Sequence, residues 1–365
     1  MKTDLIIIGA GPGGYHTAVY AARQGLEVTI IERKHVGGIC LNSGCIPTKA
    51  LCHDASLLDA ASLVTGAQPE VDFDRISNRK RDVVEKLRQD VESLMAQPGI
   101  TLVRGNAVFK DRNTVSVNGE DYCSDNIIIA TGSRPKPLRV EGFDLPGVMT
   151  SDGLLELSTL PRSLCIIGAG VIGLEFASVF RSFGCEVTVV EYMKECLPPY
   201  DQDISRRVRK AMEKRGIKFV MQAGVSRIAT TDGLLEVDYE CKGKAGQAVA
   251  DIVLVATGRE VDSGGLGLEA IGVATERGCI TVDDNMRTNI DGIYAIGDVN
   301  GRCMLAHAAI MQGMRCVNGI IGKPDDIRLD VMPSAVFTNP EAASVGFTEA
   351  QCRDAGLDYS VRKTP

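Results

Sequence analysis

Short apolar runs separated by glycine-rich turns recur along the chain and predict alternating strands and helices. Residues 5–8 (Leu-Ile-Ile-Ile) predict a buried strand, a glycine-rich turn and a helical segment follow, and residues 28–32 (Val-Thr-Ile-Ile-Glu) predict a second strand that ends in an acid. Residues 164–191 repeat the pattern of residues 5–32. Strands that alternate with helices in this way predict an α/β fold with parallel sheets.

Each copy of the repeat contains the glycine spacing of a dinucleotide-binding turn. A GxGxxG turn joins the first strand to the helix, and the second strand ends in a glutamate 23 positions after the first glycine. These residues are Gly9, Gly11, Gly14 and Glu32 in the first copy, and Gly168, Gly170, Gly173 and Glu191 in the second. Such glycines let a pyrophosphate approach the helix N-terminus, so two complete copies predict two bound dinucleotides. The alternative is two glycine-rich turns of ordinary α/β packing.

The acid of the second copy indicates which nucleotide is accepted. A carboxylate at the end of that strand accepts hydrogen bonds from ribose hydroxyls and repels a 2′-phosphate. Glu191 therefore favours NAD over NADP, although Lys194 adds positive charge nearby.

Two cysteines, Cys40 and Cys45, lie five positions apart and are followed by Lys49. In a regular helix their Cα atoms would be roughly 8.7 Å apart, whereas a disulfide needs about 4.4 to 6.8 Å. Gly44 leaves helical geometry easily and Pro47 suits a first helical turn, so we expect an irregular entry to a helix that begins near Cys45. A thiolate at a helix N-terminus is stabilised. We interpret the pair as a redox-active dithiol, the alternative being two ordinary buried thiols.

The other ten cysteines show no CxxC pair and no metal-ligand cluster. We expect them to be reduced core or surface residues, and we expect no metal site. They are Cys52, Cys123, Cys165, Cys185, Cys196, Cys241, Cys279, Cys303, Cys316 and Cys352.

Three later apolar runs predict further strands. Residues 127–132 and 252–258 each end in Ala-Thr-Gly and would each close one dinucleotide unit, which makes Gly132 and Gly258 candidate cofactor-binding residues. Residues 293–298 bring Asp298 to the C-terminal end of a strand, where ligands of such sheets bind, although Asp298 could instead cap a helix. Residues 82–95 predict a helix with an apolar stripe that packs in the core.

Composition excludes several classes of protein. The chain has 365 residues, 44% of them apolar, and can form two or three domains. Its net charge of −7 provides no basic surface for nucleic acid. We expect no membrane span and no signal peptide, because Met1 to Asp4 lead straight into the first strand, and the expected compartment is therefore the cytoplasm.

Residues 37–49 and the two dinucleotide fingerprints resemble the flavoprotein disulfide reductases over essentially the whole chain, and Leu41 and Ile46 are similar to the dihydrolipoyl dehydrogenase branch. The resemblance implies two Rossmann-like domains, with the NAD-binding domain inserted in the FAD-binding domain, and a truncated α+β interface domain. Residues 1–144 and 261–330 would form the FAD-binding domain, residues 145–260 the NAD-binding domain, and residues 331–365 the start of the dimerisation domain.

The resemblance also implies the cofactor contacts. The first fingerprint would bind the ADP half of FAD and the second would bind NAD. Asp298 would hydrogen-bond the ribityl chain of FAD, and Ala306 would lie beside the flavin. His307 is expected to be structural.

The implied chemistry is the oxidation of dihydrolipoamide by NAD. Cys40 would form the mixed disulfide with the substrate, and Cys45 would face the flavin. Lys49 would lie near the flavin and pair with Glu175.

One departure from the family keeps alternatives open. Its members take the substrate's base from a histidine of the partner subunit's C-terminal domain, and this chain has no histidine after His307. The first hypothesis is an NAD-dependent dihydrolipoyl dehydrogenase, a homodimer in its full-length form, that serves the lipoyl carrier of a 2-oxo acid dehydrogenase or glycine cleavage complex. The alternatives are an FAD- and NAD-binding redox module limited to NADH–dye activity, and a related reductase of another disulfide.

Overall fold

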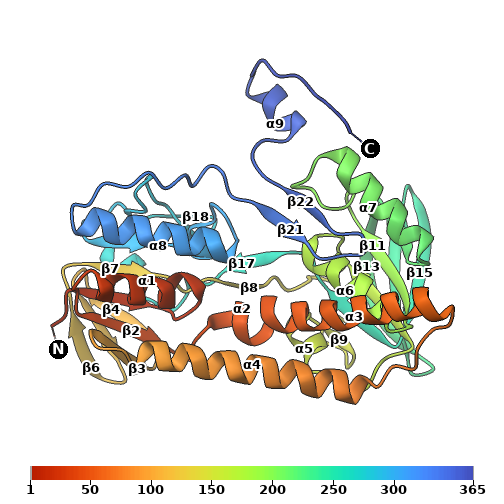
Figure 1. Ribbon diagram of the computed structural model, residues 1–365, viewed down its shortest axis with the longest axis horizontal. Coiled ribbons are helices and arrows are strands. Elements are labelled where there is room, and N and C mark those ends of the chain that lie inside the picture. Colours follow the sequence, from red (N-terminus) through yellow and green to blue (C-terminus); the bar gives the residue numbers. More distant parts are fainter. Residues whose placement is uncertain (1, 365) are drawn as a thin grey trace. The chain divides into compact units, whose positions relative to one another are not determined.

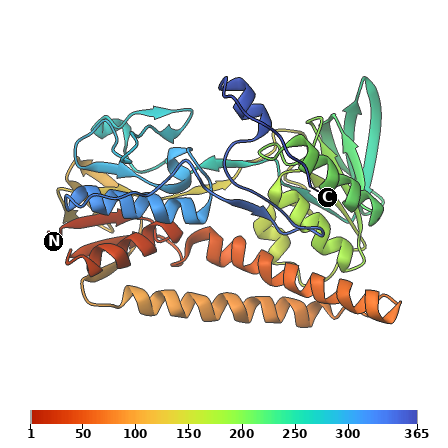
Figure 2. The ribbon, with the colours of Figure 1, turned by 45° about the horizontal axis from the view of Figure 1, so that its top comes forward.

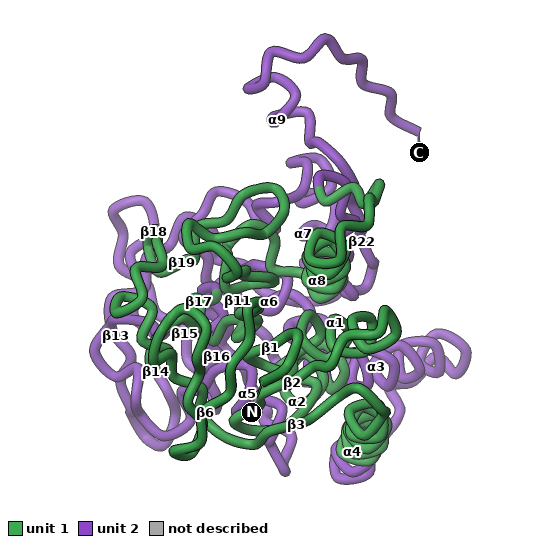
Figure 3. The backbone as a smooth tube through the Cα atoms, turned by 90° about the vertical axis from the view of Figure 1, so that its left-hand side faces the viewer, with its two compact units in different colours: residues 1–47, 81–134, 259–329 green, residues 48–80, 135–258, 330–365 purple. Residues whose placement is uncertain are grey.

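The computed structural model describes residues 2–364, and the chain forms two compact units (Figure 3). The first unit combines residues 1–47, 81–134 and 259–329, and the second combines residues 48–80, 135–258 and 330–365. Each unit contains one five-stranded parallel sheet. The α/β fold that the repeat predicts is confirmed, and each copy of the repeat lies in a different unit.

The sheet of the first unit has the strand order β20-β7-β1-β2-β3. Its strands are β1 (Leu5–Ile8), β2 (Val28–Glu32), β3 (Ile100–Arg104), β7 (Ile127–Ile129) and β20 (Ile293–Ala295). Every residue of β1, β2, β7 and β20 is buried. Continuous burial is expected where both faces of a parallel sheet are covered, and it explains why these strands have unbroken apolar runs.

Alternate residues of β1 contribute to different cores. Leu5 and Ile7 share a core cluster with residues of α1 (Pro12–Arg23) and α8 (Ala306–Ile320), two helices that lie side by side in Figures 1 and 2. Ile6 and Ile8 face the other way, because successive strand side chains point to opposite faces, and they share a cluster with a small antiparallel sheet. That sheet contains β4 (Ala107–Asp111), β5 (Thr114–Val117) and β6 (Glu120–Cys123).

The second unit repeats this plan. Its sheet has the order β12-β11-β10-β16-β9, with β9 (Val148–Met149), β10 (Ser163–Ile167), β11 (Glu186–Glu191), β12 (Lys218–Met221) and β16 (Ile252–Val255). Leu164 and Ile166 pack in a cluster with α6 (Val171–Ser182), whereas Cys165 and Ile167 face an antiparallel sheet. The latter contains β13 (Ala223–Thr231), β14 (Leu234–Cys241) and β15 (Lys244–Ala250).

Helix α4 (Phe73–Met95) begins well before the predicted start near residue 82. Its buried face continues backwards through Lys80, Ser77 and Phe73, which follow helical spacing and are 4%, 2% and 8% exposed. The apolar pattern missed this part because two of the three buried positions are polar. Lys80 tolerates burial because its ammonium donates a hydrogen bond to the carbonyl oxygen of Leu155. The predicted core role is confirmed for Val84, Leu87, Val91, Leu94 and Met95.

The remaining elements are two longer helices, α3 (Cys45–Thr65) and α7 (Gln202–Lys214), together with shorter helices and three short strand pairs. The shorter helices are α2 (Gly38–Ser43), α5 (Ser151–Leu155), α9 (Glu349–Asp354) and the 3₁₀ turns η1 (Glu269–Ile271) and η2 (Gly297–Asn300). The strand pairs are β8 (Ser133–Pro135) with β17 (Arg259–Val261), β18 (Thr275–Glu276) with β19 (Cys279–Ile280), and β21 (Ser334–Val336) with β22 (Ala342–Ser344). Among residues 2–364, no helix combines the length and apolar character that a membrane span requires.

Candidate active site

A disulfide joins Cys40 of α2 to Cys45, the first residue of α3. Their Cα atoms lie 4.6 Å apart, so the helix is broken between them as the spacing predicts. The break falls at Gly44, whose φ of −146° and ψ of −107° are not helical. A Cβ on Gly44 would come 3.0 Å from the carbonyl oxygen of Ile39, so glycine allows a close approach here. Cys45 is exposed and Cys40 is partly buried.

Lys49 lies one turn after Cys45 on α3 and forms an ion pair with Glu175 of α6. Its Nζ is 2.7 Å from each carboxylate oxygen of Glu175, and the glutamate side chain is only 4% exposed. Phe337 contacts both charges, because its main-chain N–H donates to Glu175 Oε1 at 3.0 Å and its ring centroid lies 4.8 Å from Lys49 Nζ. The family resemblance implied the Lys49–Glu175 pair, but the sequence offered no signal for the contact of Phe337, which depends on two segments far apart in the chain.

The acids of the two fingerprints are held in the same way. Glu32 accepts hydrogen bonds of 2.8 Å from the N–H groups of Ala10 and Lys34. Glu191 accepts bonds of 2.5 and 2.6 Å from the N–H groups of Ala169 and Met193. Each carboxylate is therefore fixed at the end of its strand, beside the glycine turn of its own unit.

The third glycine of each turn is required by packing. A Cβ on Gly14 would lie 1.8 Å from the carbonyl oxygen of Gly9, and a Cβ on Gly173 would lie 2.1 Å from that of Gly168. Any side chain would push the helix off the preceding strand. These contacts explain the spacing of the motif before any ligand is considered.

Asp298 lies in η2, directly after β20, and the neighbouring strand β7 leads to Ser133. Strands β7 and β20 are parallel, so both segments lie at the C-terminal edge of the sheet. Ser133 Oγ donates a hydrogen bond to Asp298 Oδ2. Asp298 makes no side-chain cap for η2, whose N-cap is Ile296, so the alternative of a capping role is not supported. Arg259, which the sequence analysis did not single out, donates to Ser133.

Comparison with known proteins identifies the family. Residues 3–313 match the pyridine nucleotide-disulphide oxidoreductase model, and residues 332–365 match the dimerisation domain of the same family. The chain belongs to the pyridine nucleotide-disulphide oxidoreductases. The resemblance drawn from the sequence is thereby confirmed.

Relatives of this oxidoreductase match nearly the whole chain. It is 41% identical to dihydrolipoyl dehydrogenase of Rhizobium etli, over 98% of this chain and 80% of the relative. It is 40% identical to mitochondrial dihydrolipoyl dehydrogenase of Pisum sativum, over 100% of this chain and 76% of the relative. The structure of the HOCl-induced flavoprotein disulfide reductase RclA from Escherichia coli matches with a TM-score of 0.87 and 34% identity, covering 97% of this chain and 80% of that chain.

Oxidoreductases of this family use FAD and a nicotinamide dinucleotide, and the two turns of this chain fit such ligands. Gly11 and Gly170 are the N-cap residues of α1 and α6, and as glycines they have no side chain that could bond to the N–H groups of the first turn. A Cβ on Gly170 would meet no heavy atom within 4 Å among the described residues, and one on Gly11 would meet only the Cα of Gly38, at 3.9 Å. Each helix N-terminus therefore has open space and spare N–H donors for a pyrophosphate.

Unsatisfied polar atoms in the first unit also fit a ligand. Thr131 Oγ1 and Asn42 Oδ1 are buried and have no hydrogen-bond partner among residues 2–364. Thr131 follows β7, and the next residue, Gly132, has a φ of +76° with no atom within 4 Å of its Cβ position in the described part of the chain. In the second unit Gly258 follows β16 with a φ of +115° and equal space. Buried polar atoms without a protein partner are expected where a ligand supplies one.

The other ten cysteines differ chemically from the dithiol. All ten are free. Burial raises the pKa of Cys52, Cys165, Cys185 and Cys196 to about 12, so these thiols remain protonated near neutral pH. The described residues contain no group of three or more His, Cys, Asp or Glu side chains that could hold a metal ion.

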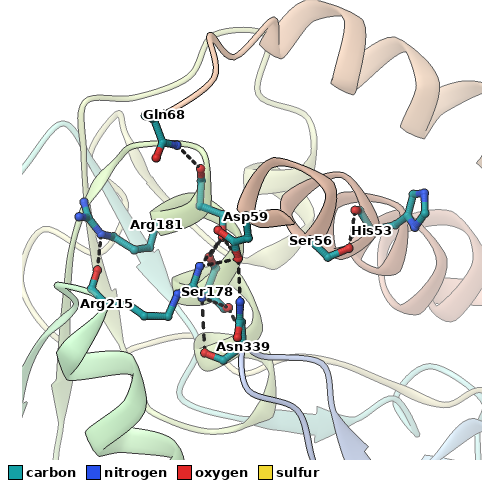
Figure 4. A network of polar contacts seen from close by, with 9 residues as sticks. His53, Ser56, Asp59, Gln68, Ser178, Arg181, Arg215 and Asn339 are labelled. Atoms are coloured by element: carbon teal, nitrogen blue, oxygen red, sulfur yellow. Dashed lines mark hydrogen bonds and ion pairs between the residues drawn. The ribbon is translucent and has the colours of Figure 1, made fainter. Parts of the chain in front are cut away.

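A polar network holds the segment after β21 against helices of the second unit (Figure 4). Asp59 of α3 accepts hydrogen bonds from Arg215, from Ser182 and from the side-chain amide of Asn339. The main-chain N–H of Asn339 donates to Ser178 Oγ at 3.0 Å. The segment is thus tied to α3 and α6, the two helices that carry the ion pair beside Phe337.

Proposed function

We propose that this chain is a dihydrolipoyl dehydrogenase, which oxidises dihydrolipoamide at the Cys40–Cys45 disulfide with NAD⁺ as the final acceptor. The observation that carries the proposal is the disulfide at the break between α2 and α3, one turn before the paired Lys49. The relatives of Rhizobium etli and Pisum sativum, which are 41% and 40% identical, support the choice of substrate.

The catalytic roles follow from thiol–disulfide exchange. A thiolate of the substrate attacks Cys40 Sγ, the Cys40–Cys45 bond breaks, and Cys45 leaves as a thiolate. The second substrate thiolate then displaces Cys40, so the substrate becomes a disulfide and the protein a dithiol. Lys49, held by Glu175, places a positive charge one helical turn from Cys45, where it stabilises the thiolate. FAD, when bound, supplies the two-electron transfer that connects this dithiol to NAD⁺.

We assign the cofactor contacts and the domains as the resemblance implies. Residues 1–144 and 261–330 bind FAD through the first fingerprint, Gly132, Asp298 and Ala306, and residues 145–260 bind NAD through the second fingerprint and Gly258. Residues 331–365 begin a dimerisation domain, which the family match over residues 332–365 supports. The proposed substrate carrier is the lipoyl domain of a 2-oxo acid dehydrogenase or glycine cleavage complex.

A second candidate substrate is a disulfide other than lipoamide, and one structural comparison supports it. The structural match to RclA, a flavoprotein disulfide reductase that is 34% identical, supports a candidate whose substrate is a disulfide other than lipoamide. The alternative activity is the NADH-dependent reduction of a different disulfide.

Steady-state assays test the proposal. The purified protein should reduce NAD⁺ with dihydrolipoamide, and Cys40→Ser should abolish this reaction while NADH–dye reduction persists. Cys52→Ser is the matched control, since Cys52 is a free thiol on α3, the helix that begins at Cys45, and it should leave turnover unchanged. Turnover of another disulfide with NADH, without any turnover of dihydrolipoamide, would favour the second candidate.

A further inference from the structure

Three side chains of the first unit form a chain of hydrogen bonds that ends on Asp298. The guanidinium of Arg259 donates two bonds of 2.7 Å to Ser133, from Nε to Oγ and from Nη2 to the main-chain oxygen. Ser133 Oγ in turn contacts Asp298 Oδ2. The Ser133 residue is 4% exposed, and the side chains of Arg259 and Asp298 are 18% and 24% exposed.

The direction of these bonds follows from the groups involved. A guanidinium has only donors, so Ser133 Oγ must accept from Arg259. The single hydroxyl hydrogen of Ser133 is then available for Asp298, which accepts as a carboxylate. Arg259 therefore determines where the Ser133 hydrogen points, and Ser133 determines how the Asp298 carboxylate is rotated.

The rotation leaves one carboxylate oxygen available. Oδ2 accepts from Ser133 and lies 3.9 Å from Arg259 Nε. Oδ1 accepts no hydrogen bond from the described residues, and the side chain lies at the C-terminal edge of the sheet. A fixed carboxylate with one satisfied and one open oxygen is prepared to accept a bond from a ligand hydroxyl.

We propose that Ser133, held by Arg259, is a positioning residue that orients Asp298 toward the polyhydroxyl chain of the flavin. Ser133 does not touch the ligand in this proposal, and its effect passes entirely through Asp298. The inference rests on the proposed function, since it assumes that the first unit binds FAD.

The proposal predicts a split between the two halves of the cofactor. The adenosine half is assigned to the glycine turn and Glu32, and the flavin half to the strand edge that carries Asp298. Loss of the Ser133 hydroxyl should therefore weaken binding of FAD without affecting binding of ADP. Hydrogen bonds to a charged, partly buried acceptor are strong enough to change the dissociation constant of FAD about tenfold.

Titration of apoprotein with FAD and with ADP tests this prediction. Ser133→Ala should raise the dissociation constant of FAD about tenfold and leave that of ADP unchanged. Ser124→Ala is the matched control, because Ser124 is also a buried serine of this unit that donates one hydrogen bond and accepts another, but its partners are Asp4 and Asn126. It should leave the affinity for FAD unchanged.

A double-mutant cycle identifies the route of the effect. In an Asp298→Ala background, Ser133→Ala should have no further effect on the affinity for FAD. The proposal is overturned if the effects of the two substitutions on the affinity for FAD add in full. It is also overturned if Ser133→Ala weakens the binding of ADP as much as that of FAD, or weakens the binding of neither. Binding of ADP and the unfolding temperature of the apoprotein show whether each variant is folded.

The outcome is independent of the substrate. Failure to oxidise dihydrolipoamide would overturn the proposed function while the FAD titrations still decide the role of Ser133. Failure of the parent apoprotein to bind FAD would overturn both.

Discussion

The main-chain N–H of Phe337 and the ammonium of Lys49 donate to the same oxygen, Oε1 of Glu175, at 3.0 and 2.7 Å. One buried carboxylate thus holds both the lysine that follows the dithiol and the segment that begins the family's dimerisation domain. Glu175 therefore links Phe337 directly to Lys49.

The two partners of this ion pair should not be equally important for stability. Lys49→Met leaves the Glu175 carboxylate buried without its counter-charge, whereas Glu175→Gln leaves a lysine that is 35% exposed and remains hydrated. We expect Lys49→Met to lower the free energy of unfolding by about 2 to 4 kcal/mol, and Glu175→Gln by about half as much. Urea denaturation measures both, with Lys110→Met as the control because its pair with Asp121 is exposed. Equal losses would contradict the asymmetry.

Reduction of the dithiol should have a spectroscopic signature. If Cys45 faces the flavin, two-electron reduction should produce a long-wavelength absorption band from its thiolate. The band should disappear in Cys45→Ser and persist in Cys40→Ser. The opposite result would show that the roles of the two cysteines are reversed.

The nucleotide preference should follow Glu191. Its carboxylate is fixed by the N–H groups of Ala169 and Met193 at the end of β11, where we expect it to bind ribose hydroxyls and repel a 2′-phosphate. NADH should reduce the flavin much faster than NADPH. Glu191→Ala should reduce the difference between the activation free energies for the two nucleotides by about 1 to 3 kcal/mol. Stopped-flow reduction with each nucleotide measures the gap, and equal rates in the parent protein would refute the assignment.

Alkylation should distinguish the dithiol from other cysteines. At pH 8, thiols with a pKa of about 12 are ionised to only about one part in ten thousand, and three buried cysteines and the partly buried Cys52 have such values. After reduction, iodoacetamide should label Cys40 and Cys45 within minutes and leave Cys52, Cys165, Cys185 and Cys196 unlabelled. Peptide mass spectrometry provides the measurement. Labelling of Cys52 at the same rate would show that its burial does not persist in solution.

The start of β10 should make the second unit sensitive to acid. Burial acts to raise the pKa of Asp251, but hydrogen bonds from the N–H and hydroxyl of Ser163, together with Arg162, hold it below its ordinary value of 3.8. Because the pKa of Asp251 is lower in the folded protein, its contribution to the free energy of unfolding is complete above the ordinary value of 3.8. This contribution is lost as the pH falls from 3.8 through the lower pKa of the folded state. Asp251→Asn should therefore lower the free energy of unfolding by about 1 kcal/mol at pH 7. The difference in this free energy between the variant and the parent protein should shrink below pH 3.8. A difference that stays constant down to pH 3 would exclude this origin.

Local patterns were sufficient for the two Rossmann-like sheets. The runs around Ile7 and Ile166 are apolar because both faces of each sheet are covered, so they were recognisable without any contact being known. The same holds for Gly14 and Gly173, because the clash that excludes a side chain is with a glycine only five residues earlier. Helix α4 was recognised only in part, since Ser77 and Lys80 continue its buried face with polar side chains.

The sequence by itself determined those features whose cause lies within one supersecondary unit: the strand–turn–helix repeat, the acids at the strand ends, and the break in the helix at Gly44 that brings Cys40 to Cys45. Only the tertiary structure decided which distant residues complete the site. Phe337 meets Glu175 across 162 positions, and Arg259 meets Ser133 across 126. The physical reason is that a glycine turn or a helix break is specified by neighbouring backbone geometry, whereas a hydrogen bond between remote segments depends on how whole helices and sheets pack.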